Sequence, residues 1–326
     1  MPEVSERIAG LSDNKRRLLE RLMQEKAASA AVADKHKPVS FVATGSPASR
    51  TSSSASKPLS GEDFSLNEVK ANYKRFYDAV NTQLDSSVFG AFSFFLNYGY
   101  VPDFSRQYSS IELPDHFINK NSVRLVLELI GECVLDDQRI LDVGCGRGGT
   151  VFVIKQFFKP HSIQGLDLSS NAIASCRANH KYDNVRFHEG DAEKLPFSNE
   201  EFEIVTNVES SHSYPNVNAF YAEVFRVLAP GGCFLYTDLM PVETIAANLA
   251  ELKRIGFVME LERDITRNVL LSCDEVATTR VSAFDSGNDQ NLMSNFLATP
   301  GSQVYEDMRS ERWSYRIYRF RKPTVV

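Results

Sequence analysis

The chain has 326 residues, 43% of them hydrophobic, and a formal net charge of −6, values typical of a globular protein and unsuited to nonspecific nucleic-acid binding. Its five cysteines are scattered and form no Cys-x-x-Cys pair, so we expect reduced thiols in a cytoplasmic protein, with neither a disulfide framework nor a zinc site. No apolar run approaches transmembrane length and the polar N-terminus does not resemble a signal peptide, so we expect no membrane partner.

The first 60 residues differ from the rest in charge. They hold ten Lys or Arg and six Asp or Glu, a net of +4 that leaves −10 for the remainder. Residues 11–23 predict a short helix with one apolar stripe, and such a helix is marginal in water without a partner. Residues 1–37 are therefore expected either to fold back on the domain or to act as a docking or linker segment. Residues 38–61 contain eight serines in 24 positions, which predicts a flexible tether.

Residues 62–135 are expected to form a helical cap over the active site. Helical spacing of apolar residues is visible from Leu66 through Val80. Eight aromatic residues follow among the twenty positions 89–108. Aromatic residues usually indicate core, but polar residues and glycines interrupt this segment, which suits the wall of a pocket.

The run from Arg139 to Gly149 is the most informative part of the chain. An apolar strand ends at Asp142, a glycine loop follows, and a helix is expected from about Thr150. The glycines fit the dinucleotide fingerprint, and they also fit a tighter Asp-x-Gly-x-Gly-x-Gly pattern. A carboxylate at Asp142 would repel a pyrophosphate but attract a cofactor with a cationic amino-acid end, such as S-adenosylmethionine.

Three further strands are predicted to end in polar residues, over residues 162–167, 185–189 and 202–209. Because the carboxyl ends of parallel strands meet at one edge of the sheet, these residues should converge on one ligand. Asp167 could accept the hydroxyls of a ribose. After the third strand, Asp191 could accept the exocyclic amine of adenine.

The rest of the chain completes an α/β pattern, with expected helices over 219–228 and 245–256 and strands over 231–238, 257–261 and 313–320. The last strand alternates with period two and is expected to add antiparallel near the sheet edge. An interrupted helical region is expected to form a lid insertion at about 262–300. The prediction is a doubly wound, seven-stranded, mostly parallel sheet over residues 136–326, with the N-terminal helical cap and the lid added to it.

The span from about residue 141 to 238 resembles a class I S-adenosylmethionine-dependent methyltransferase. Within that group, the segments Phe94-Phe95-Leu96-Asn97-Tyr98-Gly99-Tyr100 and Val208-Glu209-Ser210-Ser211-His212-Ser213-Tyr214-Pro215 are similar to those of O-methyltransferases in polyketide and mixed peptide–polyketide pathways. The resemblance implies a Rossmann-like fold, the cofactor S-adenosyl-L-methionine and a small hydroxylated acceptor. It also implies that the acceptor is either free or bound to a carrier protein or synthase, which the N-terminal helix would contact.

The resemblance assigns cofactor contacts to the strand ends, and the cap adds two aromatic candidates that would favour a sulfonium cation. The expected cofactor-binding residues are Asp142, Gly144, Gly146, Gly148, Asp167, Leu168, Asp191, Ala192, Asn207, Tyr77 and Tyr98.

A hydroxyl acceptor must lose its proton as it attacks, and His212, just beyond the fourth strand, is the expected general base. Asp238 at the end of the fifth strand and Glu209 are rival acids that could orient and stabilise its imidazolium. No tight acidic motif accompanies them, so we expect no metal.

Three other functions stay open at this point. An N- or C-methyltransferase of the same fold would act on an amine or carbanion and depend less on His212. A methyltransferase-like assembly module would not be a catalyst at all, although the intact acids and glycines argue against it. A nicotinamide oxidoreductase is opposed by Asp142 and by the Gly190-Asp191-Ala192 turn.

Overall fold

The computed structural model describes residues 65–86, 94–103, 109–113, 117, 119–282 and 294–324, without the side chains of 277–282. The expected N-terminal helix and the serine-rich tether lie outside the described residues. So do four of the eight aromatic residues of the cap, Phe89, Phe92, Phe104 and Tyr108. No helix in the described part of the chain is long and apolar enough to cross a membrane.

A single seven-stranded sheet forms the centre of the molecule, with strand order β3-β2-β1-β4-β5-β7-β6. The strands are β1 (Arg139–Val143), β2 (Ser162–Asp167), β3 (Val185–Glu189), β4 (Phe202–Val208), β5 (Leu228–Pro241), β6 (Val258–Asp264) and β7 (Trp313–Arg321). Strands β1 to β5 are parallel, and β7 lies antiparallel between β5 and β6. The predicted doubly wound, mostly parallel sheet is therefore confirmed.

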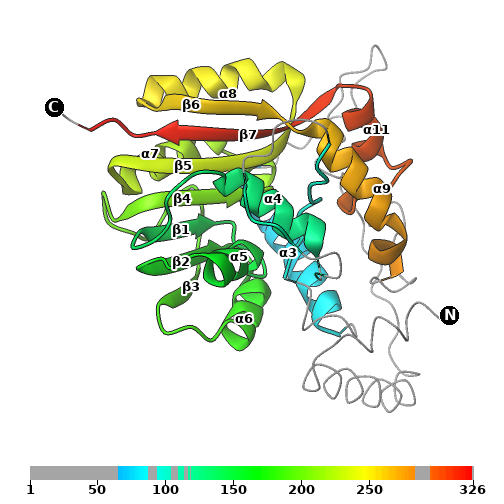
Figure 1. The fold of residues 1–326 in the computed structure, drawn as a ribbon, viewed down its shortest axis with the longest axis horizontal. Helices are drawn as coiled ribbons and strands as arrows, with labels where there is room; N and C mark the ends of the chain where they lie inside the picture. The colour runs from blue at the N-terminus through cyan, green and yellow to red at the C-terminus, as the bar shows by residue number, and fades with distance from the viewer. Residues whose placement is uncertain are drawn as a thin grey trace.

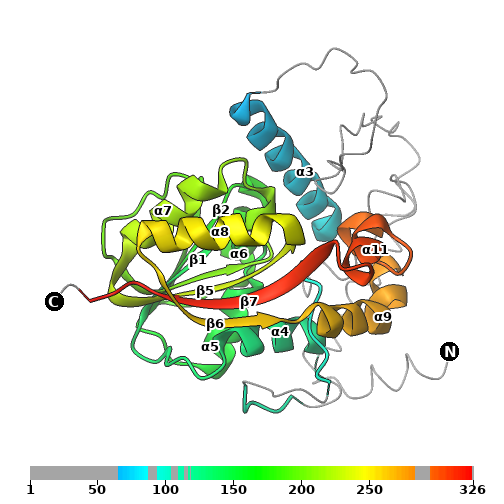
Figure 2. The same ribbon diagram turned by 90° about the horizontal axis from the view of Figure 1, so that it is seen from above.

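Helices cover both faces of this sheet (Figure 2), because each strand presents alternate residues to opposite sides. Ile140 joins the core beneath α4 (Lys120–Ile130), α5 (Gly149–Phe157) and α6 (Ser170–Asn179). Its neighbour Leu141 joins the core beneath α7 (Val217–Val227) and α8 (Val242–Ile255).

Three more helices gather at the carboxyl end of the parallel strands (Figure 1). They are α3 (Leu66–Ser86), α9 (Thr266–Ser282) and α11 (Gln303–Arg309). Helix α3 packs against α6, and α11 contacts both α9 and β7. This arrangement encloses the edge of the sheet at which the predicted site residues lie.

One difference from the predicted boundaries is at the start of β5. The strand begins at Leu228 rather than Gly231, and its pairing with β4 shifts register between Phe202 and Ile204. The turn at Gly231 and Gly232 stays in the sheet because both residues exchange backbone hydrogen bonds with Lys322, just beyond β7. The sequence around Pro230 resembles a loop, and the pairing with Lys322 and that of Leu228 with Phe202 make it part of a strand.

Candidate active site

The glycine loop after β1 has a backbone that only glycine adopts easily. Gly144, Gly146 and Gly148 have φ values of +68°, +50° and +81°. A Cβ atom at Gly144 would also lie 1.9 Å from the Ser210 hydroxyl oxygen. The Gly144 amide donates to the Leu166 carbonyl at 2.8 Å, which turns the loop over the end of β2. At Gly144, the absence of a side chain therefore permits a close approach of the backbone to Ser210 and to β2.

Two acceptor atoms beneath this loop have no donor in the described part of the chain. Asp142 is 1% exposed, and its Oδ1 accepts a hydrogen bond from Thr206 at 2.7 Å while Oδ2 has no partner. Burial raises the pKa of Asp142 to about 7 although the Thr206 hydrogen bond opposes this, and the Asp167 carboxylate raises it further. Asn207 likewise leaves its buried Oδ1 without a partner. An ammonium group is a donor of the kind that each of these oxygens lacks, so the site fits a cofactor with a cationic amino-acid end.

Asp167 lies at the end of β2 and is bound to the glycine loop. Its Oδ2 accepts the Gly146 amide at 2.8 Å and its Oδ1 accepts the Ser169 amide at 2.8 Å. An ionised carboxylate has about four acceptor positions, so the two that remain can take the hydroxyls of a ribose. The carbonyl of Leu168 accepts a hydrogen bond from Lys74 of α3 at 3.0 Å.

The Asp191 carboxylate after β3 is held by a cation that sequence analysis did not identify. Lys70 of α3 lies 2.7 Å from Asp191 and 2.6 Å from Glu193, with 20% of its side chain exposed. Ala192 is buried beside them. An adenine amine at Asp191 would share this carboxylate with Lys70, and α3 would then contribute to adenine binding.

Arg147, inside the glycine loop, is a second residue that sequence analysis missed. Only 2% of it is exposed, and its guanidinium donates to Asp85 at 2.6 Å and to the side-chain oxygen of Asn81 at 3.2 Å. Its carbonyl lies 2.9 Å from His180 Nε2. The only signal in the sequence is a cation among small and apolar residues, where it must be paired if buried. Helix α3 and the glycine loop are therefore joined through an ion pair whose guanidinium is buried and whose carboxylate is partly exposed.

His212 and Asp238 form a hydrogen-bonded dyad at the same edge of the sheet. His212 lies in the short 3-10 helix η3 (Ser211–Ser213), and its Nδ1 is 2.7 Å from Asp238 Oδ1. Asp238 is 1% exposed at its side chain and His212 22% exposed. Since an ionised carboxylate can only accept, a neutral His212 carries its proton on Nδ1 and keeps a free lone pair on Nε2. Burial lowers the pKa of His212, but Asp238 and Glu209 outweigh it and raise the pKa above its usual value.

Glu209 lies beside the dyad and has other partners. Its Oε2 accepts the Tyr98 amide at 2.9 Å and the Tyr315 hydroxyl at 2.6 Å. Burial raises the pKa of Glu209 to about 7 against these two hydrogen bonds, which lower it. Of the two acids left open by the sequence, Asp238 is the one hydrogen-bonded to the His212 imidazole.

The two predicted cofactor tyrosines lie on the His212 side of the site. The Tyr77 hydroxyl is 3.0 Å from the Ser213 hydroxyl. Tyr98 contacts Glu209 through its backbone, and its ring centroid is 6.4 Å from that of Tyr315. Tyr77 therefore contacts the residue that follows His212, and Tyr98 contacts the acid beside the dyad.

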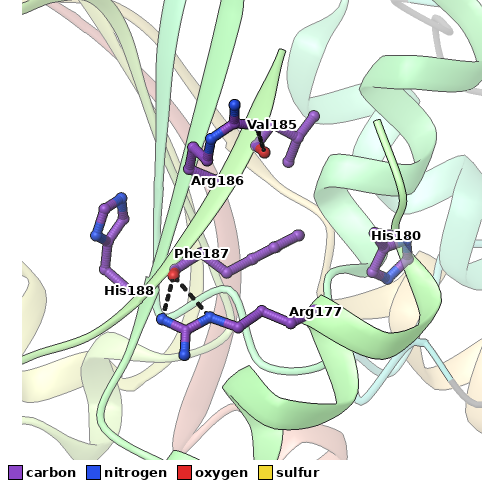
Figure 3. A pocket seen from close by; sticks show the side chains of 6 residues that line it. All are labelled: Arg177, His180, Val185, Arg186, Phe187 and His188. Carbon is purple, nitrogen blue, oxygen red and sulfur yellow. Dashed lines mark hydrogen bonds between the residues drawn. The ribbon is translucent and has the colours of Figure 1, made fainter. Parts of the chain in front are cut away.

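The pocket outside β3 (Figure 3) is separate from the strand-end site described above. Its lining includes Arg177, whose guanidinium donates two hydrogen bonds to the Phe187 carbonyl, at 2.7 and 3.2 Å. Arg186 likewise donates to the backbone, at 2.9 Å to Asp183 and 2.8 Å to Val185. These arginines hold α6 and its following turn against the edge strand. Among the described residues, no group of three or more His, Cys, Asp or Glu side chains could hold a metal ion.

Comparison with known proteins gives consistent results. A family model described as a methyltransferase domain matches residues 135–294. The chain is 35% identical to a fatty-acid O-methyltransferase of Mycolicibacterium smegmatis over 70% of this chain and 83% of the relative. It is 34% identical to a phthiotriol/phenolphthiotriol dimycocerosates methyltransferase of Mycobacterium tuberculosis over 63% and 77%. Its fold is similar to that of the cyclase SpnF, with a TM-score of 0.61 and 22% identity over 78% of this chain and 96% of that one.

Proposed function

This chain belongs to the S-adenosylmethionine-dependent methyltransferases, and we propose that it methylates a hydroxyl oxygen of a lipid or polyketide-like acceptor. In this proposal His212 is the general base. S-adenosylmethionine, when bound, supplies an electrophilic methyl group on its sulfonium. The relatives support an oxygen acceptor, because one of them is named a fatty-acid O-methyltransferase. Methyl transfer is an in-line displacement, so the main tasks of the protein are alignment and removal of the acceptor proton.

The observation that carries this proposal is the 2.7 Å hydrogen bond between His212 Nδ1 and Asp238 Oδ1. It leaves Nε2 of a neutral imidazole to take the proton from the acceptor hydroxyl. Asp238 then stabilises the imidazolium and keeps the ring in one orientation. A general base of this kind contributes about 10²–10⁴-fold in rate.

We assign the cofactor contacts by the chemistry of each group. Asp142 and Asn207 face the ammonium end with their unpartnered oxygens. Asp167 accepts the ribose hydroxyls, and Asp191 with Ala192 binds the adenine. Tyr77 and Tyr98 close the site between the methyl group and the acceptor.

A carboxylic acid acceptor is the second candidate, because the relative from Mycolicibacterium smegmatis is named for fatty acids. A carboxylate is already ionised at neutral pH and needs no base. It would, however, bring a negative charge close to Asp238 and Glu209, which disfavours it electrostatically. A neutral hydroxyl meets no such repulsion and makes use of His212.

The test is methyl transfer from labelled S-adenosylmethionine by the full chain to two acceptors of equal length, a fatty acid and a hydroxylated lipid without a carboxyl group. We expect transfer to the hydroxylated lipid and a loss of about 10²–10⁴-fold in kcat for His212→Gln. His161→Gln, an exposed histidine before β2, is the matched control and should leave kcat unchanged. Full activity of His212→Gln, or transfer to the fatty acid alone, would contradict the proposal.

We further propose that residues 1–37 dock a carrier protein that bears the acceptor. The basic charge and single apolar stripe of this segment support that proposal. In the same assay, a chain beginning at Ser60 should lose activity on carrier-bound acceptor and keep it on free acceptor. Equal activity on both acceptors would leave the segment without a docking role.

A further inference from the structure

Behind Asp238, three hydroxyl groups form a continuous hydrogen-bonded chain into the core. The Ser211 hydroxyl lies 2.5 Å from Asp238 Oδ2 and 2.6 Å from the Tyr236 hydroxyl. The Tyr236 hydroxyl is in turn 3.3 Å from that of Tyr221. Ser211, Tyr236 and Tyr221 are 4%, 2% and 0% exposed, so water does not compete for these bonds.

The donors in this chain all point toward Asp238. An ionised carboxylate can only accept, so Ser211 must donate to it. The Ser211 oxygen then accepts from Tyr236, and the Tyr236 oxygen accepts from Tyr221. Burial raises the pKa of both tyrosines, so each phenol keeps the proton that it donates. Hydrogen bonds aligned in one direction polarise and strengthen one another.

Asp238 has every acceptor position filled. Besides Ser211 and His212 Nδ1, it accepts the backbone amides of His212 at 3.0 Å and Leu239 at 2.8 Å. These four bonds match the roughly four lone-pair positions of a carboxylate. The carboxylate therefore cannot rotate, and only one of its positions is directed at the imidazole.

We infer that Ser211, Tyr236 and Tyr221 are positioning residues that hold the Asp238 carboxylate in one orientation, and that their hydroxyl chain limits the basicity of His212. The inference rests on the proposed role of His212 as base. Donors on a carboxylate disperse its charge, so it stabilises the imidazolium less strongly. Without the chain, more of the imidazole is protonated at neutral pH and cannot act as a base.

Two charged groups face His212 from the elements around it, Asp238 of β5 and Glu209 beyond β4, and both raise its pKa. Glu209 has separate donors, the Tyr98 amide and the Tyr315 hydroxyl. Removing the hydroxyl chain therefore changes only the contribution of Asp238.

The test is an NMR pH titration of the full, ¹⁵N-histidine-labelled chain with S-adenosylhomocysteine, in which the His212 signal is identified by its loss in His212→Gln. In Ser211→Ala, we expect the His212 pKa to rise by about one unit, since one hydrogen bond to a charged group is lost. Tyr236→Phe should raise it by less, and Tyr221→Phe by least, because each acts through the next hydroxyl. The acidic limb of the pH–rate profile should move in the same direction.

Tyr318→Phe is the matched control. Tyr318 is 1% exposed, its ring stacks 5.9 Å from that of Tyr236, and its hydroxyl takes no part in the hydrogen bonds that link Ser211, Tyr236 and Tyr221. The Tyr318→Phe substitution removes a buried phenol hydroxyl without breaking the hydrogen-bonded hydroxyl chain, so the His212 pKa should not change. An equal rise in Tyr318→Phe, or no rise in either Ser211→Ala or Tyr236→Phe, overturns the inference. Full activity of His212→Gln overturns the base itself, whereas an inactive His212→Gln with unshifted titrations overturns only the hydroxyl chain.

Discussion

Asp142 shows at the scale of one residue how ligand binding and stability oppose each other. It is buried at the end of β1 with one oxygen unpartnered, and burial raises its pKa to about 7. A charged group in such a place destabilises the ligand-free protein. The ionised carboxylate becomes favourable when a cation lies beside it, so Asp142 is suited to the protein with a cationic ligand bound.

Asp142→Asn should therefore weaken the binding of S-adenosylhomocysteine, which carries the same ammonium group, by about tenfold or more. In the unchanged chain, affinity should fall as pH drops below about 7, because Asp142 becomes protonated and loses its attraction for the ammonium. In the variant this dependence should be much reduced. Calorimetric titration between pH 5.5 and 8.5 measures both effects.

Two controls separate this effect from general changes in charge. Asp183→Asn makes the same substitution at an exposed acid before β3 and should bind like the unchanged chain. Adenosine lacks the ammonium group, so its affinity should not respond to Asp142→Asn. A loss of adenosine affinity equal to that of S-adenosylhomocysteine would show that the variant distorts the loop instead.

At the scale of elements, α3 connects the cap to the cofactor edge through polar residues about one turn apart. Lys70 binds Asp191, Lys74 binds the Leu168 carbonyl, and Asp78 accepts the Ser169 hydroxyl at 2.6 Å. Its last turn holds Asp85, the ion-pair partner of Arg147. The position of the glycine loop therefore depends on α3 as well as on β1.

Removing Asp85 should disturb both stability and binding. In Asp85→Asn, the buried guanidinium of Arg147 loses its charged partner, which should destabilise the fold by about 1–2 kcal/mol, a value kept low because 47% of the Asp85 side chain is exposed. The dissociation constant for S-adenosylhomocysteine should rise as well, since Arg147 belongs to the glycine loop. Urea denaturation and calorimetry measure the two quantities.

The surface ion pair between Arg254 and Glu251 of α8 is the control for the Asp85→Asn prediction. Arg254 is 72% exposed at its side chain, and the pair lies away from the glycine loop. Glu251→Gln should therefore leave both the urea midpoint and the affinity unchanged. A destabilisation equal to that of Asp85→Asn would mean that Asp85 contributes no more than a surface pair.

At the scale of the whole molecule, the sequence predicted what depends on local pattern. Strand-end acids such as Asp142 and Asp167 could be placed because a parallel sheet brings all its carboxyl ends to one edge. The partners of these residues could not be found, because Lys70 lies 121 positions from Asp191 and Tyr315 lies 106 positions from Glu209. No periodicity encodes such pairs; the packing of cap and sheet creates them.

The choice between Asp238 and Glu209 was open for the same reason. Glu209 is three positions from His212, and Asp238 is 26 positions away. The register of β4 against β5 pairs Val208 with Thr237 and so brings Asp238 level with the start of the His212 loop. The sequence did not choose between the two acids, whereas the sheet register brings Asp238 to the His212 imidazole.

Three groups of the site, Asp142, Glu209 and His212, together predict how the stability of the ligand-free chain depends on pH. The pKa values of Asp142 and Glu209 are raised to about 7, against about 4 in an unfolded chain, and that of His212 is also raised. A raised pKa means that the folded state binds more protons between the two values. The stability from the two carboxyl groups is therefore full below about pH 4 and is lost as pH rises through about 7. The stability from His212 is full below its unfolded pKa and is lost as pH rises through its raised pKa in the folded chain.

We accordingly expect the unfolding free energy attributable to the site to fall by on the order of a few kcal/mol between pH 5 and 8. The double variant Asp142→Asn, Glu209→Gln should show a flatter profile and should be more stable than the unchanged chain at pH 8. S-adenosylhomocysteine should stabilise the unchanged chain at pH 8 by mass action and the double variant much less, because the variant lacks the carboxylate that receives the ammonium. Urea denaturation across this pH range, with and without the ligand, measures all three effects. Equal pH profiles for the two proteins would show that the buried carboxylates do not destabilise the ligand-free fold. Binding of the cofactor ammonium would then remove no unfavourable electrostatic free energy from the site.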